Sequence, residues 1–559
     1  MNRNRSSQLC CLVMAALCSA AGLTMPSANA APDQQASATS TSGVTTRIDA
    51  IFKRWDSNTT PGCSVGVDQN GEPTARRAYG SADLEHDAAN TPETIFEAGS
   101  VSKQFAAAAI LLLAERHKVS LSDDVRKYLP ELPQYQAVIT LDQLLSHTSG
   151  LRDWGVIGAI AGWPRTTRAY TMDDVLSITA AQRALNYTPT TEYSYTNTGF
   201  SLLTLIVQRV TGQTMAQFAR EQIFEPLGMT RTQWRDDFRR IVKQRAVAYN
   251  PTADGYKQLM PFENTYGHGG LLTTVGDMLR WNQALTSERL GAFVTGKLQQ
   301  RAVLSNGRQI AYARGLMVNS YHGQPQVSHA GATAGYRAWL GRFPQQGLSI
   351  ALLCNAAEAD SVGLAHQVAD LFLPADTTPA VKAVKLRPRK LEVLTGLFVE
   401  ELSGMPLTLE NRQGQLAMKG GSVLEATSAT EFRMGEARIR FDGTDRFELK
   451  REYADPTRFR RTTPYAPTPT DLQQQAGTYR SDEADATYII AAQDGKLIMK
   501  LHDRPAVSME LSPAYQHAYT GDDDTLIRFH YDAAGKVTEL SFGASRVRDL
   551  RFQRVDTQR

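Results

Sequence analysis

A serine and a lysine three positions apart are the side chains in this sequence whose spacing most clearly suggests chemistry. Ser100 and Lys103 stand directly before a run of strong helix formers at residues 104–114. On a helix, residues three apart share a face. The run is apolar on every face, which predicts a buried central helix. Burial disfavours an ammonium ion, so a neutral Lys103 can take the proton of Ser100 and make the serine a nucleophile.

Two further motifs supply partners for such a nucleophile. Tyr195-Thr196-Asn197 precedes a helix predicted to start near Gly199, and His329-Ala330-Gly331 stands at the end of a predicted strand. Each motif by itself is common, and Ser-x-x-Lys is often a capped helix start with a solvated lysine. Their joint occurrence, in this order and with a buried helix after the first, favours an acyl-transfer site.

With these three motifs the sequence resembles the serine β-lactamase and penicillin-binding-protein superfamily. The likeness is to the branch of class C β-lactamases, D-alanyl-D-alanine carboxypeptidases, D-aminopeptidases and lactamase-like esterases. The motifs match its Ser-x-x-Lys, Tyr-x-Asn and Lys/His-x-Gly elements. Further similar stretches are Leu-Leu-Ser-His-Thr-Ser-Gly-Leu at 144–151, Pro-Leu-Gly-Met at 226–229, Gly-His-Gly-Gly-Leu at 267–271 and His-Ala-Gly-Ala-Thr-Ala-Gly-Tyr at 329–336.

The resemblance implies a role for each of three catalytic residues. Ser100 attacks a carbonyl carbon and forms an acyl-enzyme, and Lys103 takes the serine proton. Tyr195, as a phenolate or a hydrogen-bond relay, passes a proton to the leaving group. No cofactor takes part in this chemistry.

The resemblance also implies how the substrate is held. Asn197 binds the substrate amide, and the backbone N–H groups of Ser100 and Ala332 form an oxyanion hole beside Gly331. His329 stands where β-lactamases have a lysine that grips a carboxylate. Histidine is mostly neutral at pH 7, which favours an esterase or aminopeptidase over a β-lactamase or carboxypeptidase.

The predicted elements that carry these motifs form one domain over residues 45–375. An Asn-Gly turn between two apolar runs predicts a β-hairpin at 63–80. Residues 120–320 are mostly helical, and strand patterns return over 326–354 before a last helix. Strands at both ends with helices between them predict an α/β fold with an antiparallel sheet and a helical subdomain, as in β-lactamases.

The C-terminal part of the chain contains an internal repeat of strand-like segments. Leu-Glu-Val-Leu-Thr-Gly-Leu-Phe at 391–398 matches Leu-Gln-Gln-Gln-Ala-Gly-Thr-Tyr at 472–479. The pattern predicts two tandem all-β modules, each a small barrel or meander, which resemble the lipocalin-like C-terminal barrels of D-aminopeptidases. The predicted bounds are a linker at 376–390, module 1 at 391–463, a linker at 464–471 and module 2 at 472–559.

The N-terminus has the features of a secretory signal peptide. A basic start, an apolar run at 9–23 and the small-residue site Ala28-Asn29-Ala30 predict cleavage of residues 1–30 and export to the periplasm or the medium. Residues 31–44 are small and polar and predict a disordered leader. The alternative is a membrane anchor, but the run is short for a span of roughly 20 residues, so we expect no stable membrane insertion.

Composition excludes several other classes of protein. The net charge of +3, without a Lys/Arg run, carries no nucleic-acid signal. No His-Glu-x-x-His motif or cysteine cluster indicates a metal site, and His147 and His268 are interpreted as structural hydrogen-bonding residues. Outside the signal, Cys63 and Cys354 predict either two buried thiols or, if their strands are neighbours, a disulfide.

The sequence therefore predicts an exported serine hydrolase. Its expected substrates are small peptides of the D-amino-acid type, or esters. A β-lactamase or D-Ala-D-Ala carboxypeptidase with the same machinery is the first alternative. The second is a non-catalytic protein that binds peptidoglycan, peptide or lipid, against which the intact Ser100, Lys103 and Tyr195 argue. The expected partner is a small-molecule or short-peptide substrate, and the sequence carries no signal for an oligomeric state.

Overall fold

The computed structural model describes residues 34–163, 168–375, 383–435, 437–451, 456–522 and 525–555. The signal peptide predicted at 1–30 lies outside the described residues. The chain falls into two compact units, Met1–Thr46 and Arg47–Arg559. No helix among the described residues is long and apolar enough to cross a bilayer.

The polar leader predicted as disordered is helical where the structure describes it. Helix α1 (Gln34–Phe52) begins within the 31–44 segment and runs on through the helix expected from Thr46. The prediction of disorder for residues 34–44 is therefore wrong in this structure. An α-helix satisfies its own backbone hydrogen bonds, so a helix can include small polar residues whose composition alone indicates disorder.

An antiparallel sheet of six strands forms the centre of the hydrolase part and joins its two sequence ends. The strand order is β10 (Met317–Tyr321), β11 (Gln324–Thr333), β12 (Tyr336–Phe343), β13 (Leu348–Cys354), β1 (Cys63–Gln69) and β2 (Glu72–Tyr79). The hairpin turn has positive φ at Asn70 (54°) and Gly71 (84°), as a tight turn between twisted strands requires. The α/β fold with an antiparallel sheet is confirmed.

Pairing of β1 with β13 settles the question of the two cysteines. Cys63 lies directly opposite Cys354 in the strand register, and the two form a disulfide. The disulfide joins two neighbouring strands of the sheet, one from each end of the hydrolase part. The two cysteines lie 291 residues apart in the sequence. Of the two alternatives from the sequence, the structure shows the disulfide.

The helical subdomain is built around α2 (Lys103–Glu115), which follows a 3₁₀ turn at Gly99–Ser102. Every residue from Lys103 to Leu113 is buried, as the apolar sequence predicts. The other helices of the hydrolase part are α3 (Leu141–Leu145), α4 (Trp154–Ile160), α5 (Met172–Ala181), α6 (Asn197–Thr211), α7 (Met215–Ala219), α8 (Glu225–Leu227), α9 (Val275–Thr286) and α10 (Ala292–Gln299), with α11 (Ser361–Ala369) against the sheet. Short strands between them are β3 (Ser81–Asp83), β4 (Ala88–Ala89), β5 (Phe96–Glu97), β6 (Gln233–Trp234), β7 (Tyr249–Thr252), β8 (Gly255–Gln258) and β9 (Leu271–Thr273).

Strand β11 is longer than the sequence predicts. His329-Ala330-Gly331 is predicted to stand at the end of a strand, whereas β11 continues beyond this motif to Thr333. His329 therefore lies inside the strand, not at its end. The turn comes at Ala334, whose φ is 47°. Glycine is common at strand ends and turns because it has no side chain. At Gly331 the missing side chain instead allows the strand to pack closely against the backbone of Ala98.

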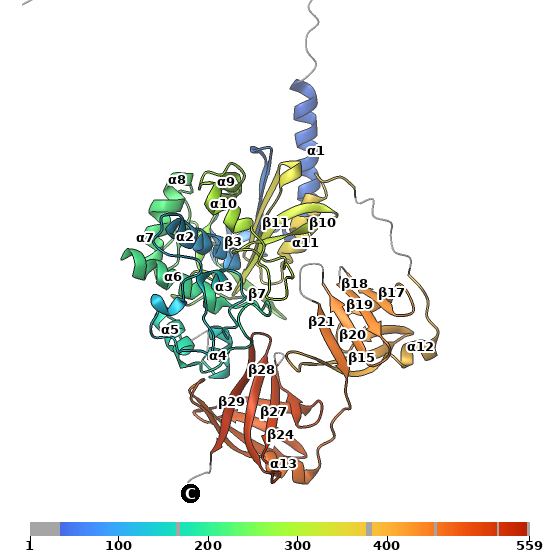
Figure 1. The fold of residues 1–559 in the computed structure, drawn as a ribbon. Helices are drawn as coiled ribbons and strands as arrows, with labels where there is room; N and C mark the ends of the chain where they lie inside the picture. Colours follow the sequence, from blue (N-terminus) through green and yellow to red (C-terminus); the bar gives the residue numbers. More distant parts are fainter. Residues whose placement is uncertain are drawn as a thin grey trace, which may run out of the picture. The chain divides into compact units, whose positions relative to one another are not determined.

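The C-terminal part consists of two closed antiparallel barrels of eight strands each (Figure 1). The first, preceded by α12 (Pro388–Glu392), has β14 (Gly396–Glu400), β15 (Pro406–Arg412), β16 (Gln415–Met418), β17 (Val423–Ala426), β18 (Glu431–Met434), β19 (Ala437–Asp442), β20 (Arg446–Lys450) and β21 (Thr457–Arg461). The second, preceded by α13 (Pro469–Gln475), has β22 (Gly477–Ser481), β23 (Ala486–Gln493), β24 (Lys496–Leu501), β25 (Arg504–Pro513), β26 (Ala518–Thr520), β27 (Leu526–Tyr531), β28 (Val537–Ala544) and β29 (Val547–Val555). Strict alternation of buried and exposed residues in β19 shows how one strand fills a barrel interior. The two tandem all-β modules are confirmed.

The second barrel packs on the helical subdomain. Tyr488 donates a hydrogen bond to the carbonyl of Ile160 at 2.7 Å. Arg152, almost fully buried, forms an ion pair with Glu483 at 2.8 Å. Trp154 and Ile160 belong to the same apolar cluster as the barrel interior. The loops of this barrel are therefore held against α4, the helix that follows Asp153.

Candidate active site

The structure brings the serine and lysine of the first motif into contact. The Lys103 Nζ atom lies 3.1 Å from the Ser100 Oγ atom. It also donates to Asn197 Oδ1 at 3.0 Å and to the backbone oxygen of His268 at 2.7 Å. A neutral amine has two N–H groups and one lone pair. Because two of the three contacts are acceptors only, the lone pair is left for the Ser100 hydroxyl.

The surroundings of Lys103 favour that neutral form. The side chain is fully buried, and this burial lowers the pKa of Lys103 well below its ordinary value of 10.5. The positive charge of Arg546 lowers it further, whereas the carboxylate of Asp153 raises it. The amine also lies over the ring of Tyr195, 4.7 Å from its centroid. Lys103 is thus placed and prepared to accept a proton.

Tyr195 lies beside the nucleophile and hydrogen-bonds the Ser100 hydroxyl. Burial raises the pKa of Tyr195 above its ordinary value, while its hydrogen bond with Ser100 and the charge of Arg546 oppose the rise. The phenol is therefore neutral at pH 7. Of the two roles considered for Tyr195, a hydrogen-bond relay fits this state and a standing phenolate does not.

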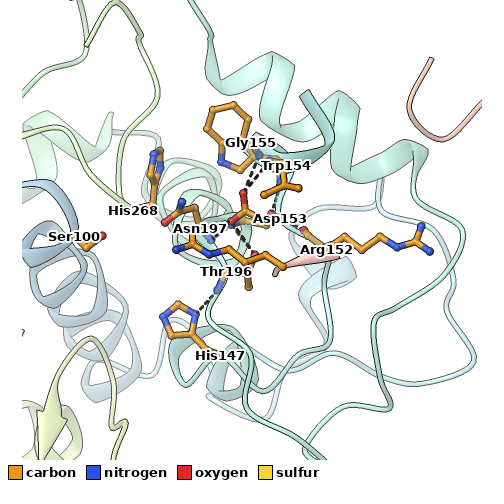
Figure 2. Close-up of polar contacts among 12 residues, drawn as sticks. Ser100, His147, Arg152, Asp153, Trp154, Gly155, Thr196, Asn197 and His268 are labelled. Atoms are coloured by element: carbon orange, nitrogen blue, oxygen red, sulfur yellow. Dashed lines mark hydrogen bonds and ion pairs between the residues drawn. The ribbon is translucent and has the colours of Figure 1, made fainter. Parts of the chain in front are cut away.

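His147 holds the loop that carries Tyr195 through the backbone of Thr196 (Figure 2). His147 Nδ1 accepts a hydrogen bond from the backbone N–H of Thr196 at 3.2 Å, and its ring lies 4.3 Å from the Tyr195 ring. Burial lowers the pKa of His147 well below 6.5, so its ring is neutral. His268 contributes its backbone oxygen, while its ring contacts the Ser201 hydroxyl at 2.8 Å. Both histidines act here through structural hydrogen bonds.

Asp153 links the helix starts behind the site. Its Oδ1 atom caps α4 by accepting from the N–H groups of Gly155 at 3.0 Å and Val156 at 3.2 Å. Its Oδ2 atom accepts from the N–H of Asn197 at 2.7 Å, the first residue of α6 (Figure 2). One buried carboxylate thus sets where Asn197 meets Lys103. Asp153 was not predicted as a site residue, although an Asp before an apolar helix is a capping signal.

His329 has both ring nitrogens occupied. Its Nδ1 atom lies 2.6 Å from the backbone oxygen of Ala330, which can only accept, so Nδ1 carries the hydrogen. Its Nε2 atom lies 3.1 Å from the hydroxyl of Tyr312 and accepts from it. Burial and the nearby Lys103 lower the pKa of His329 to about 4. His329 is therefore neutral and offers no N–H group to a bound molecule.

Two glycines allow the strand and the nucleophile turn to approach. A Cβ atom on Gly331 would lie 2.0 Å from the oxygen of Ala98, and one on Gly99 would lie 2.6 Å from the backbone nitrogen of Ala332. Gly99 also has a φ of 50°, which L side chains rarely adopt. Without side chains at these positions, Ser100 and Ala332 come to line the same cavity.

A cavity of about 590 Å³ collects the predicted residues. Six of the seven line it, and Lys103 lies beneath Ser100. The six are Ser100, Tyr195, Asn197, His329, Gly331 and Ala332. Sequence reasoning missed the other polar lining residues, namely Tyr193, Tyr312, Arg337, Asp360, Ser361 and Arg546. Arg546 comes from the turn between β28 and β29 of the second barrel, and no local pattern marks it as a site residue.

A separate cluster has the residue types of a metal site. Asp83, Glu85 and His86 bring three ligand atoms within 4.8 Å of one another, and it is the one such cluster in the described part of the chain. His86 Nδ1 already hydrogen-bonds Asp83 Oδ2 at 2.8 Å, and two of the residues are exposed. None of the three lines the cavity at Ser100.

A family model, sequence relatives and solved structures are similar to this chain. The β-lactamase family model matches residues 48–372. The D-aminopeptidase of Brucella anthropi is 25% identical over 517 residues, covering 89% of this chain and 95% of the relative. An octameric penicillin-binding protein homologue from Pyrococcus abyssi has a TM-score of 0.53 at 20% identity, over 75% of this chain and 99% of that one. The D-amino acid amidase of Ochrobactrum anthropi SV3, solved with L-phenylalanine amide, has a TM-score of 0.51 at 22% identity, over 59% and 98%.

Proposed function

Because the chain belongs to the β-lactamase family, and is a serine hydrolase of peptide or amide bonds, we propose that it works through an acyl-enzyme on Ser100. The observation that carries this proposal is the environment of Lys103. Its Nζ atom is buried, gives its N–H groups to two carbonyl oxygens and lies 3.1 Å from Ser100 Oγ. A solvated structural lysine has no need of this arrangement.

In the first step Ser100 Oγ attacks the carbonyl carbon of the scissile bond. Lys103 takes the hydroxyl proton as the new C–O bond forms. The negative charge that develops on the carbonyl oxygen is stabilised by the backbone N–H groups of Ser100 and Ala332, each such donor being worth roughly 3–4 kcal/mol. Asn197 is held by Asp153 and Lys103 where it can bind the amide of the acyl part.

The leaving group departs with the proton that came from Ser100. The proton passes from Lys103 through the Tyr195 hydroxyl to the leaving nitrogen, and the C–N bond breaks. Water then attacks the ester carbonyl. Its proton returns by the same two side chains to the Ser100 oxygen, which frees the acid product and restores the site.

The relatives narrow the substrate class. D-aminopeptidase and D-amino acid amidase are the names of proteins similar to this chain, so we propose short peptides or amides that contain D-amino acids. The same acyl-enzyme route can also cleave esters, because an alkoxide is a better leaving group than an amine. A β-lactamase activity is disfavoured, since the neutral His329 replaces the cation that grips the β-lactam carboxylate.

We further propose that the protein is exported to the periplasm or secreted. The predicted signal at 1–30 is one support. The Cys63–Cys354 disulfide is another, because disulfides persist in oxidising compartments.

Labelling of the nucleophile tests the proposed chemistry. Wild type and Ser100→Ala are incubated with a fluorophosphonate, p-nitrophenyl esters, D- and L-aminoacyl anilides and a chromogenic cephalosporin. We expect a covalent adduct on Ser100 by peptide mass spectrometry, turnover of esters and D-aminoacyl amides by wild type, and neither with Ser100→Ala. A folded wild-type protein that no acyl or phosphonyl reagent modifies at Ser100 is a binding protein instead.

A further inference from the structure

One side of the first barrel has an outer surface made only of charged side chains. Strands β18, β19, β20 and β21 are neighbours in this barrel (Figure 1). Along each strand, residues that point into the barrel alternate with residues that point outward. The outward side chains, which we call the charged face, are acidic at Glu431, Asp442 and Glu448 and basic at Arg433, Arg438, Arg440, Arg446, Lys450, Arg458 and Arg460.

The charged face leaves no mark in the sequence as a basic run. Because every second residue of a strand faces the same way, cations that are separated in the sequence by apolar core residues gather on one surface. In β19, for example, Arg438 and Arg440 are exposed on either side of the buried Ile439. The barrel therefore concentrates positive charge that the composition of the chain does not reveal.

Three of these cations lie directly opposite one another across neighbouring strands. Arg433 of β18 is paired in the strand register with Arg438 of β19, which is paired in turn with Lys450 of β20. We call these three residues the basic row. In the described part of the chain no carboxylate forms an ion pair with any of them, although Glu425 of β17 lies opposite Arg433. Like charges directly opposite each other destabilise a sheet, so the free protein keeps this row at a cost.

A second pair of like charges lies farther along the same strands. Arg446 of β20 is paired in the register with Arg460 of β21. Arg446 lies 3.8 Å from Glu401, which is beyond hydrogen-bond distance. Arg460 has no ion pair with any described residue. Local departures from stable pairing of this kind are typical of functional sites.

Between the basic row and this second pair, the charges alternate in sign. Arg440 lies 3.8 Å from Glu431, and Arg458 lies 3.6 Å from Glu448. The two arginine side chains are 79% and 72% exposed, so their N–H groups are open to a bound molecule. A cavity of about 480 Å³ on this face is lined by Arg440, Arg458 and Arg446 together with nearby carboxylates.

This pattern of charge favours one class of partner over two others. Rows of cations about 4.8 Å apart suit a chain that carries carboxylates at intervals, and arginine binds carboxylates with paired hydrogen bonds. The acids between the cations accept hydrogen bonds from hydroxyl groups but repel a continuous line of phosphates. No outward side chain of the charged face is aromatic, which disfavours stacking with nucleic-acid bases. None is apolar, which disfavours insertion into a bilayer.

We propose that the charged face of the first barrel binds an acidic polysaccharide, a chain of sugars that carries carboxylates and free hydroxyl groups. The carboxylates lie against the basic row and the Arg446–Arg460 pair and supply the opposite charge that the sheet itself lacks. The hydroxyl groups donate to Glu431 and Glu448. This binding does not involve Ser100, so it stands apart from the proposed hydrolysis and holds the enzyme on a polymer surface.

Two forms of one oligosaccharide test this site on the full chain. A fluorescent oligogalacturonate supplies the carboxylates, and its fully methyl-esterified form lacks their charge. Fluorescence anisotropy at low ionic strength is expected to show binding of the acid form, at least roughly 10-fold weaker binding of the ester form, and weaker binding of the acid form as salt rises. The acid form should also raise the Tm of the wild-type protein.

Substitution of the basic row locates the binding. The triple variant Arg433→Gln/Arg438→Gln/Lys450→Gln is expected to lose roughly 10-fold in affinity for the acid form. Its own Tm should stay at or above that of wild type, because the substitutions remove repulsion between neighbouring strands. A fall in affinity is therefore not the result of unfolding.

A second triple variant controls for total charge. Lys243→Gln/Lys257→Gln/Lys536→Gln removes the same number of exposed cations from outside the charged face and should keep wild-type affinity. Equal losses in both triple variants, equal binding of the two oligosaccharide forms, or no binding by wild type would overturn the site. Tighter binding of a single-stranded DNA oligonucleotide or of phosphatidylglycerol vesicles would overturn the assignment to a polysaccharide.

Discussion

The Nζ atom of Lys103 lies 3.1 Å from the Oγ atom of Ser100, and carbonyl oxygens of Asn197 and His268 accept its two other contacts at 3.0 and 2.7 Å. Three partners around one nitrogen match the two hydrogens and one lone pair of a neutral amine. Burial of Lys103 at the start of α2 lowers the pKa of its amine, and the neutral amine can act as a base.

Removal of that base is expected to slow acylation far more than binding. Lys103→Ala should reduce the rate constant for acylation of Ser100 by roughly 10²–10⁴-fold, the usual contribution of a positioned general base. Stopped-flow measurement with a p-nitrophenyl ester gives this rate constant directly. Lys127→Ala, which removes an exposed lysine paired with Asp123, serves as the control and should acylate like wild type. Retention of wild-type acylation in Lys103→Ala would exclude the lysine as the base.

The pH dependence of acylation should report the depressed pKa of Lys103. The neutral amine is the active form, so kcat/KM rises with pH through this pKa and levels off above it. Burial is the main cause of the depression, and Arg546 is the second. Arg546→Gln removes a positive charge near the amine, which makes the ammonium easier to form. The inflection measured with an uncharged p-nitrophenyl ester should therefore move to higher pH, and an unchanged or lower inflection contradicts the assignment.

The part of the site that follows local periodicity could be predicted from the sequence. Ser100 and Lys103 share a face because they are three apart at a helix start, and the apolar run after them can only be a buried helix. The contacts of Tyr195 and His329 with the nucleophile could not be predicted from local patterns. No local pattern shows which loop or strand faces Ser100. The family resemblance supplied that information.

Other features depend on tertiary contacts that no local pattern encodes. Arg546 enters the cavity because Asn186 and Asp153 bind the backbone of its loop, and neither residue is near it in sequence. Gly331 lies inside β11, beyond the predicted end of the strand, and the oxygen of Ala98 occupies the place that a side chain would take. A missing Cβ allows either a tight turn or a close approach of two backbone segments. Only the tertiary packing shows which of the two applies.

Close packing at Gly331 leads to a prediction about the oxyanion hole. In Gly331→Ala the new Cβ would lie 2.0 Å from Ala98 O and 3.0 Å from Ser100 N, so strand and nucleophile turn must separate. We expect at least a roughly 100-fold loss in kcat, the scale for one misplaced oxyanion donor, together with a lower Tm. Gly296→Ala in α10, where nothing lies within 4 Å, is the matched control and should be neutral or slightly stabilising. Wild-type kcat in Gly331→Ala would show that the strand can shift without cost to catalysis.

Burial of neutral His329 predicts a pH dependence of stability. Its pKa falls from 6.5 to about 4 in the folded protein. Between these values the unfolded chain binds a proton that the folded protein does not, so the free energy of unfolding falls as pH drops from about 6.5 to about 4. His366, lowered to about 4 by burial, acts in the same direction.

The effect of His329 on stability can be separated by substitution. The histidine accounts for a loss on the order of 2–3 kcal/mol across this range. In His329→Gln the unfolding free energy from urea titrations should depend less steeply on pH between 4 and 6.5, although its value at pH 7 is lower. His86→Gln, an exposed histidine outside the cavity, should leave the slope nearly as in wild type. An unchanged slope in His329→Gln would mean that folding does not lower the pKa of His329.

The Cys63–Cys354 disulfide should contribute to stability without taking part in catalysis. It joins β1 to β13 across 291 residues of chain, and neither cysteine lines the cavity at Ser100. Reduction, or the double variant Cys63→Ala/Cys354→Ala, is expected to lower the free energy of unfolding by on the order of 2–5 kcal/mol, because the unfolded chain regains freedom. At temperatures well below the Tm, kcat/KM for an ester should stay within about twofold. Dithiothreitol should lower the Tm of wild type and leave the double variant unchanged, whereas an equal shift in both would show that the reductant acts elsewhere.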